Sequence, residues 1–96
     1  MEMDFDAETA TGDVLVDFWA TWCGPCRMMG EIIEANLKPA MPSLMVVKVN
    51  VDDEPEIAAR FGIQSIPTLI CFRDGAKLAE FVGVTDVGEI KAAFGG

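Results

Sequence analysis

The feature that most constrains the fold is a Cys-Gly-Pro-Cys motif that closely follows a short apolar run. Residues 14–19 read Val-Leu-Val-Asp-Phe-Trp, a run of strand length that is apolar at nearly every position, as in a strand covered on both faces. Cys23 and Cys26 follow, with Pro25 between them, where the first turn of a helix tolerates a missing N–H. The motif therefore marks the junction between a buried strand and a helix.

The remaining sequence continues to alternate between strand and helix patterns. The helix after Cys26 is predicted to end near Pro39 and Pro42. The later segments are a strand at 44–51, a helix at 55–61 capped by the acidic run 52–54, a strand at 68–72, a turn at Asp74-Gly75, a strand at 77–82, and a helix from Thr85 or Asp86 to Phe94.

This order predicts an α/β fold in a single domain that spans residues 1–96. Strands separated by helices are expected to run parallel through right-handed crossovers, and the hairpin adds an antiparallel edge strand. The result is one mixed sheet with helices on both faces. A chain of 96 residues can bury one core of this kind but not two.

The charge of the chain limits its partners. Sixteen acidic and seven basic side chains leave a net charge of −9, which repels nucleic acid and anionic membrane surfaces. No apolar run approaches the roughly 20 residues of a membrane span. Residues 1–13 are acidic and lack the pattern of a signal peptide. We therefore expect a cytoplasmic protein. We also expect it to be a monomer.

The cysteines indicate redox chemistry. Two intervening residues let one helical turn hold the sulfurs of Cys23 and Cys26 within bonding distance, and unpaired N–H groups at the helix N-terminus stabilise a thiolate on the first cysteine. Because the thiolate is the nucleophile in disulfide exchange, Cys23 is expected to attack and the more buried Cys26 to resolve the mixed disulfide.

Two other interpretations of the cysteines are a metal half-site and simple packing. A tetrahedral sulfur site needs four ligands, and the chain has no histidine and only Cys71 besides the pair. We expect Cys71 to be a buried small hydrophobic residue, and no metal or other cofactor. Core packing is also the expected role of four methionines: Met28, Met29, Met41 and Met45.

Asp17 stands in the middle of the first apolar run, where a carboxylate is costly to bury. Burial without full pairing favours its protonated form and makes it a base available near neutral pH. The alternative is a structural carboxyl group paired with a neighbour, for which Lys48, itself placed among valines, is the obvious partner.

Three separated segments resemble the thioredoxin family in order and spacing: Val16 to Cys26 with its Trp-Cys-Gly-Pro-Cys motif, Ile66-Pro67-Thr68, and Val82-Gly83. The resemblance extends over about residues 14–94 and implies a thioredoxin fold and a protein-disulfide reductase. It also implies that a thioredoxin reductase recycles the chain after it has reduced oxidised proteins.

The resemblance further implies roles for individual residues. Pro67 is expected to be cis and to lie beside the sulfurs, Asp17 to act on the buried cysteine through water, and Lys48 to lie near the same acid. The segment that carries a substrate disulfide is expected to bind a flat apolar surface formed by Trp22, Gly24, Pro25, Ile66, Val82 and Gly83.

The sequence departs from the family pattern at two places. Glu31, preceded by Gly30, replaces a proline that usually kinks the helix, so the helix is expected to be straighter or to bend at the glycine. Only 16 residues precede Asp17, too few for the full first strand and helix of the family. The helix is missing or reduced to a turn at 7–11, and we expect a short edge strand at Met1–Phe5 followed by a loop.

Two alternative functions remain to be compared with reduction. A binding module on the same scaffold would not need the intact Trp-Cys-Gly-Pro-Cys motif together with Asp17 and Pro67. An oxidant or isomerase would use the same cysteines, but the Gly-Pro dipeptide and a cytosolic context favour a reductant.

Overall fold

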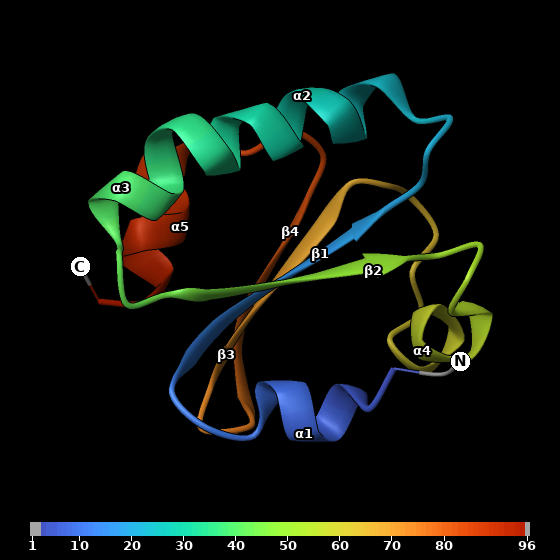
Figure 1. The fold of residues 1–96 in the computed structure, drawn as a ribbon, viewed down its shortest axis with the longest axis horizontal. Coiled ribbons are helices and arrows are strands. Elements are labelled where there is room, and N and C mark those ends of the chain that lie inside the picture. Colours follow the sequence, from blue (N-terminus) through green and yellow to red (C-terminus); the bar gives the residue numbers. More distant parts are fainter. Residues whose placement is uncertain (1–2, 96) are drawn as a thin grey trace.

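The computed structural model describes residues 3–95 and is built on a four-stranded mixed sheet with helices on both faces (Figure 1). In the sheet the strands lie in the order β2-β1-β3-β4. In chain order the elements are α1 (Phe5–Thr9), β1 (Asp13–Trp19), α2 (Gly24–Ile32), the π-helical η1 (Ile33–Leu37), α3 (Lys38–Ala40), β2 (Met45–Asn50), α4 (Pro55–Arg60), β3 (Thr68–Arg73), β4 (Ala76–Val82) and α5 (Val87–Ala93).

Strand β1 lies in the centre, as its apolar sequence predicts. It pairs in parallel with β2 and antiparallel with β3, and every residue from Val14 to Phe18 is buried. Because side chains alternate along a strand, Val14, Val16 and Phe18 share one face and Leu15 and Asp17 the other. The second face is the one covered by α2, so β1 directs Asp17 toward that helix.

Each face of the sheet has its own apolar cluster. Helices α1 and α4 cover one face, and α2, η1, α3 and α5 cover the other, as Figure 1 shows. The first cluster contains Phe5, Val14, Val16, Phe18, Val47, Val49, Ile70 and Phe72. The second contains Leu15, Met29, Ile33, Leu37, Leu69, Cys71, Ile90 and Phe94. The expectation of helices on both faces is confirmed.

The direction of the third strand was predicted wrongly. Strand β3 runs antiparallel to β1, with Phe18 opposite Thr68 and Asp13 opposite Arg73, instead of parallel to it. Helix α4 has only six residues and so advances about 9 Å, whereas a six-residue strand extends about 20 Å. The chain therefore does not return along the sheet before β3 begins, and it enters β3 at the end where β1 finishes.

The predicted edge strand at Met1–Phe5 is also wrong for the described residues, and Met1 and Glu2 lie outside them. Phe5 begins a helix instead, because the Asp4 carboxylate accepts a hydrogen bond from the Ala7 N–H at 3.2 Å and caps it. The Phe5 ring is buried against Phe61 and Phe72, with centroid separations of 5.1 and 5.8 Å. This apolar contact holds α1 against the sheet.

The helix after the cysteines is irregular at a different place from the one expected. It continues through Gly30 and Glu31, and the change comes at η1, where the Lys38 N–H donates to the Ile33 carbonyl five residues earlier. Pro39 follows directly, and a proline ring in a regular helix collides with the carbonyl four residues before it. The wider π turn moves the Ala35 carbonyl away from this ring and lets the helix continue into α3.

Within residues 3–95, no helix is both long and apolar enough to cross a membrane.

We predict that Phe5→Ala lowers the free energy of unfolding by about 3 kcal/mol, because it removes a buried aromatic ring. Glu8→Ala, on the exposed side of the same helix, serves as the control and should change it by less than about 0.5 kcal/mol. Urea denaturation of both variants measures the difference. Equal effects of the two substitutions would contradict a core role for Phe5.

Candidate active site

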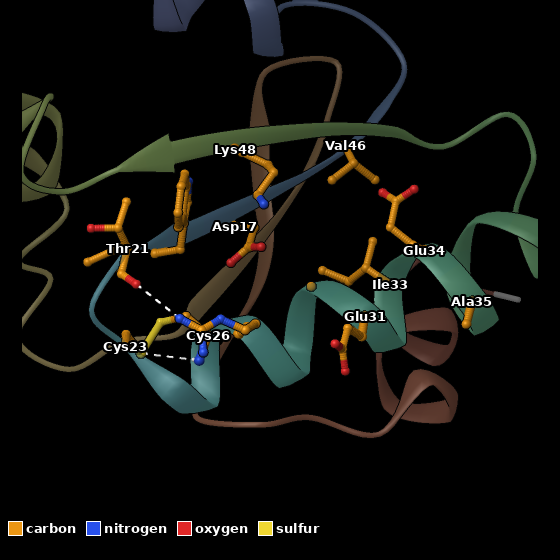
Figure 2. Close-up of a pocket in the computed structure, with 14 residues that line it drawn as sticks. Asp17, Thr21, Cys23, Cys26, Glu31, Ile33, Glu34, Ala35, Val46 and Lys48 are labelled. Atoms are coloured by element: carbon orange, nitrogen blue, oxygen red, sulfur yellow. Dashed lines mark hydrogen bonds between the residues drawn. A yellow bond between two sulfur atoms is a disulfide. The ribbon is translucent and has the colours of Figure 1, made fainter.

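Cys23 and Cys26 form a disulfide at the beginning of α2 (Figure 2). Strand β1 ends at Trp19, and a short loop leads to Cys23, which has an extended backbone and is the N-cap of the helix. Gly24 and Pro25 occupy the first exposed turn between the two cysteines. The single turn brings the two Cα atoms to 5.2 Å, within the usual range for a disulfide.

The N-terminus of α2 favours negative charge on the Cys23 sulfur. The backbone N–H of Cys26 points at the Cys23 Sγ at 3.1 Å. In the dithiol form this N–H, together with the positive end of the helix dipole, stabilises a thiolate on Cys23. Cys23 is 6% exposed and Cys26 is 3% exposed, so Cys26 is the more buried of the two by a small difference.

The Ile66–Pro67 segment lies beside the disulfide. The peptide bond between these residues is cis, as the family resemblance implied. The Ile66 carbonyl oxygen is 3.8 Å from the Cys23 Sγ, and Pro67 is buried. The Pro67 carbonyl accepts a hydrogen bond of 2.8 Å from the Gly83 N–H, so the end of β4 is held against the same segment.

The residues expected to bind substrate are brought together around the Cys23 side of the disulfide. Trp22 is 69% exposed and Val82 is 62% exposed, unusually high values for large apolar side chains. Ile66 is half-buried, and Gly83 has a φ of 90°, a left-handed conformation that favours glycine at this turn. Together with Gly24 and Pro25 they leave an apolar surface next to the sulfurs.

Sequence reasoning missed the role of Asp52. Its carboxylate accepts a hydrogen bond of 2.8 Å from the Trp22 indole N–H and so fixes the most exposed apolar side chain of the site. The acidic run 52–54 was interpreted as a helix cap, but Glu54 is the N-cap of α4 and makes no side-chain cap within the described residues. The Asn50 side chain instead accepts from the Asp52 and Asp53 N–H groups.

The expected packing role is confirmed for Met29 and for Met41, which belongs to the partly buried residues against the same cluster, and is wrong for Met28 and Met45. Met29 is fully buried in the core, but Met28 and Met45 are 55% and 56% exposed. Met28 lies in the first turns of α2, soon after the disulfide. Helical periodicity explains the difference, because Met29 shares the buried face with Cys26 and Ile33 and Met28 points away from it.

Asp17 is buried beneath α2. Its side chain has no exposed surface, and neither carboxyl oxygen has a hydrogen-bond partner among residues 3–95. Lys48 lies directly opposite it in the register of β1 and β2. Figure 2 shows the two side chains extending toward one another from these strands, with the Lys48 Nζ also 4.4 Å from the centre of the Trp19 ring.

Burial raises the pKa of Asp17 from its ordinary value of 3.8 to about 6, because removal from water penalises the carboxylate. The positive charge of Lys48 acts in the opposite direction and limits the increase. A pKa near 6 makes Asp17 largely ionised at neutral pH and still able to accept and return a proton there.

A pocket of about 610 Å³, which we call the α2–β2 groove, connects Asp17 with both cysteines and with Lys48. Its walls are β1 and β2 on one side and α2 with η1 on the other (Figure 2). Glu31, which replaces the family proline, lines this groove. The complete lining is Asp17, Trp19, Ala20, Thr21, Cys23, Cys26, Arg27, Gly30, Glu31, Ile33, Glu34, Ala35, Val46 and Lys48.

Cys71 lies apart from this site. It is fully buried on β3 in the cluster with Leu15 and Met29, as expected of a packing residue. Burial raises the pKa of its thiol to about 11, so it stays protonated and unreactive near neutral pH. In the described part of the chain, no three histidine, cysteine or acidic side chains gather in a way that could hold a metal ion.

Comparison with known proteins gives a consistent result. The family model described as Thioredoxin matches residues 1–94. A thioredoxin from Porphyra purpurea is 46% identical over 84 residues, which cover 85% of this chain and 78% of that protein. A thioredoxin from Listeria monocytogenes is 46% identical over 79 residues, covering 82% of this chain and 77% of its relative.

Solved structures agree with these sequence matches. A mutant thioredoxin from Halobacterium salinarum superposes with a TM-score of 0.82 at 33% identity, covering 96% of this chain and 80% of the other. The oxidised form of mitochondrial thioredoxin 3 from Saccharomyces cerevisiae gives a TM-score of 0.81 at 30% identity, and the match covers 94% of this chain and 84% of the other.

The pKa of Asp17 generates a prediction about stability. The native state holds the Asp17 proton more tightly than the unfolded chain, so this group's contribution to stability is fully present below pH 3.8 and fades as pH rises toward about 6. The loss amounts to about 3 kcal/mol at 1.36 kcal/mol per pH unit. In oxidised Asp17→Asn, which has no such proton, this part of the pH dependence should disappear.

The measurement is urea denaturation of the oxidised wild type and Asp17→Asn from pH 4 to pH 8. The stability of the variant relative to wild type should increase by about 2.4 kcal/mol across this range, whatever its offset at pH 4. In the Lys48→Met background the increase should be larger, because the ammonium that lowers the pKa of Asp17 is absent. A constant difference between wild type and variant would mean that Asp17 has an ordinary pKa.

Proposed function

The chain belongs to the thioredoxin family and is a thiol–disulfide oxidoreductase, and we propose that Cys23 is its attacking thiol and Cys26 its resolving thiol. The observation that carries this assignment is the position of the Cys23 sulfur at the N-terminus of α2, with the Cys26 N–H directed at it. The same sulfur lies next to the Ile66 carbonyl and the exposed apolar surface.

The proposed reaction proceeds in two exchanges. The Cys23 thiolate attacks one sulfur of a protein disulfide, which forms a mixed disulfide and releases the other substrate sulfur as a thiolate. Cys26 then gives its proton to Asp17, through water, and attacks the Cys23 sulfur. The second substrate thiolate leaves, the Cys23–Cys26 disulfide forms, and the substrate has gained the two electrons that the dithiol has lost.

Other residues support these steps in the proposal. Gly24 and Pro25 shape the turn that holds the sulfurs, and Lys48 keeps the pKa of Asp17 from rising further. Pro67, buried beside the disulfide, and Gly83 hold two backbone segments next to Cys23. The substrate segment binds across Trp22, Ile66, Val82 and Gly83, where apolar surface is already exposed.

The proposal extends to partners and location. Disulfide-containing proteins are the substrates and a thioredoxin reductase returns the electrons, as membership of the family implies. We also propose that the protein acts as a monomer in the cytoplasm, where reduced glutathione and thioredoxin systems keep thiols reduced. Its net charge of −9 favours basic surfaces on those partners.

We predict that Cys26→Ser traps a mixed disulfide with an oxidised protein through Cys23, because attack remains possible and resolution does not. Cys23→Ser should abolish reduction altogether. Cys71→Ala, which alters a buried thiol outside the site, is the matched control and should retain wild-type turnover. Mass spectrometry of the non-reduced adduct identifies the trapping cysteine. An adduct on Cys26 in Cys23→Ser, with none in Cys26→Ser, would reverse the two roles.

A further inference from the structure

The α2–β2 groove opens on a different side of the disulfide from the surface proposed to bind substrate. Its lining includes Val46 and Lys48 of β2, and none of the described residues Trp22, Ile66, Pro67, Val82 or Gly83. A segment bound across those residues therefore leaves the groove uncovered. The active site thus has two approaches, one beside Ile66 and one between α2 and β2.

The helical wall of the groove is one continuous stripe of α2 and η1. Arg27, Gly30, Glu31, Glu34 and Ala35 line it, at spacings of three, four, seven and eight residues from the first. These spacings place side chains on the same face of a helix. The stripe runs from the disulfide to η1, and Arg27, Glu31 and Glu34 make it polar beside the apolar Ile33, which also lines the groove. Water can therefore occupy the groove along its charged side chains.

Gly30 has no side chain and therefore leaves space in this wall of the groove. It lies in the interior of α2, where glycine is less favourable than alanine. Neither a positive φ nor a close contact requires glycine there. An ideal Cβ built on Gly30 meets no heavy atom within 4 Å, apart from its chain neighbours and its own helix backbone, in the described part of the chain. The space directly beside the Gly30 Cα is therefore open, and Gly30 lines the groove.

Asp17 needs a route to solvent that its own burial does not provide. Its side chain has no exposed surface and its oxygens have no partner within residues 3–95, yet it lines the groove. A buried carboxyl group in this state is a site for water. If Asp17 takes the Cys26 proton, it takes that proton while substrate still covers the other approach, and it must lose the proton before the next turnover.

We propose that water and protons reach Asp17 through the α2–β2 groove, and that Gly30 keeps this route open while a substrate occupies the opposite side of the disulfide. The proposal rests on the proposed function, in which Asp17 accepts the proton of Cys26. It adds the path by which that proton is exchanged with solvent and the residue on which the path depends.

The charged groups along the route favour this exchange. Lys48 faces Asp17 from β2, Arg27, Glu31 and Glu34 lie along α2 and η1, and the two cysteines add thiols when reduced. On the other side of β1, the residue opposite Asp17 is the apolar Leu69 of β3. The polar groups thus lie on the groove side, where they can hold a chain of water between Asp17 and solvent.

The test is to plug the groove at Gly30. In Gly30→Leu the side chain replaces water over Asp17 and should raise its pKa by about one pH unit or more, because desolvation increases. Gly30→Ala is the matched control for helix propensity and should move the pKa by less than about 0.3. Carbon-13 NMR titration of the Asp17 carboxyl group measures its pKa in the oxidised wild type and in each variant. Gly30→Met, a flexible chain of similar volume, should reproduce the leucine effect.

The consequence for turnover is measured separately. If the pKa of Asp17 rises from about 6 to about 7 in Gly30→Leu, the ionised fraction of Asp17 at pH 7 falls about twofold, and resolution of a mixed disulfide at pH 7 should slow by about the same factor. Attack by Cys23 on a disulfide should keep its rate. In the mixed disulfide trapped with Cys26→Ser, Asp17 should still titrate as it does without substrate, because the groove remains open.

Three results would overturn the route. One is an unchanged Asp17 titration in both Gly30→Leu and Gly30→Met. Another is an equal change in Gly30→Ala, which would attribute the effect to the helix instead of the groove. The third is loss of the Asp17 titration in the trapped complex. The base role of Asp17 fails by a different result, an unchanged resolution rate in Asp17→Asn, which leaves the titration of the plugged variants informative.

Discussion

A carboxyl group without a hydrogen-bond partner in the described residues lies beneath the first turns of α2, and the chemistry of the site depends on where it is held. Asp17 occupies the centre of β1, the strand that pairs on both sides and is buried throughout. The alternation of β1 directs it toward α2 and not toward α4. Its burial costs about 3 kcal/mol of stability at neutral pH, a large fraction for a domain of this size.

The same helix that covers Asp17 also activates the cysteines. The N-terminus of α2 directs the Cys26 N–H at the Cys23 sulfur. The following residues of α2 line the groove that contains Asp17. Met29, Ile33 and Leu37 anchor this helix to the sheet through buried contacts, so the distance between acid and thiols depends on core packing. Lys48, from the neighbouring strand, limits the rise in the pKa of Asp17. Strand register and helix packing together create the site.

Local features of the sequence predicted most of this arrangement. The apolar run around Asp17, the Cys-Gly-Pro-Cys motif at the helix start and the packing role of Cys71 all depend on patterns within a few residues of each position. The direction of β3 could not be predicted in the same way. It depends on the short advance of α4 relative to the length of a strand, which a crossover rule does not consider.

Other features depend on contacts between distant residues. Asp4 caps the helix that begins at Phe5, but the Phe5 ring holds this helix on the sheet by packing on Phe61 and Phe72, and nothing near Phe5 in the sequence signals those partners. Asp52 was interpreted as a cap because its neighbours are acidic, whereas it binds the indole of Trp22, which lies 30 residues earlier. The groove beside Gly30 likewise exists only when β2 lies beside α2.

The central claim is that Asp17, with its pKa raised by burial, accepts the proton of Cys26 during resolution. The most direct measurement is the rate at which a preformed mixed disulfide on Cys23 releases substrate thiol, followed by stopped flow across a pH series. In the wild type the rate should rise with pH with a midpoint near 6, where Asp17 becomes ionised, and this rise should be absent in Asp17→Asn. The same midpoint in both proteins would contradict the account and assign the proton acceptor to another group.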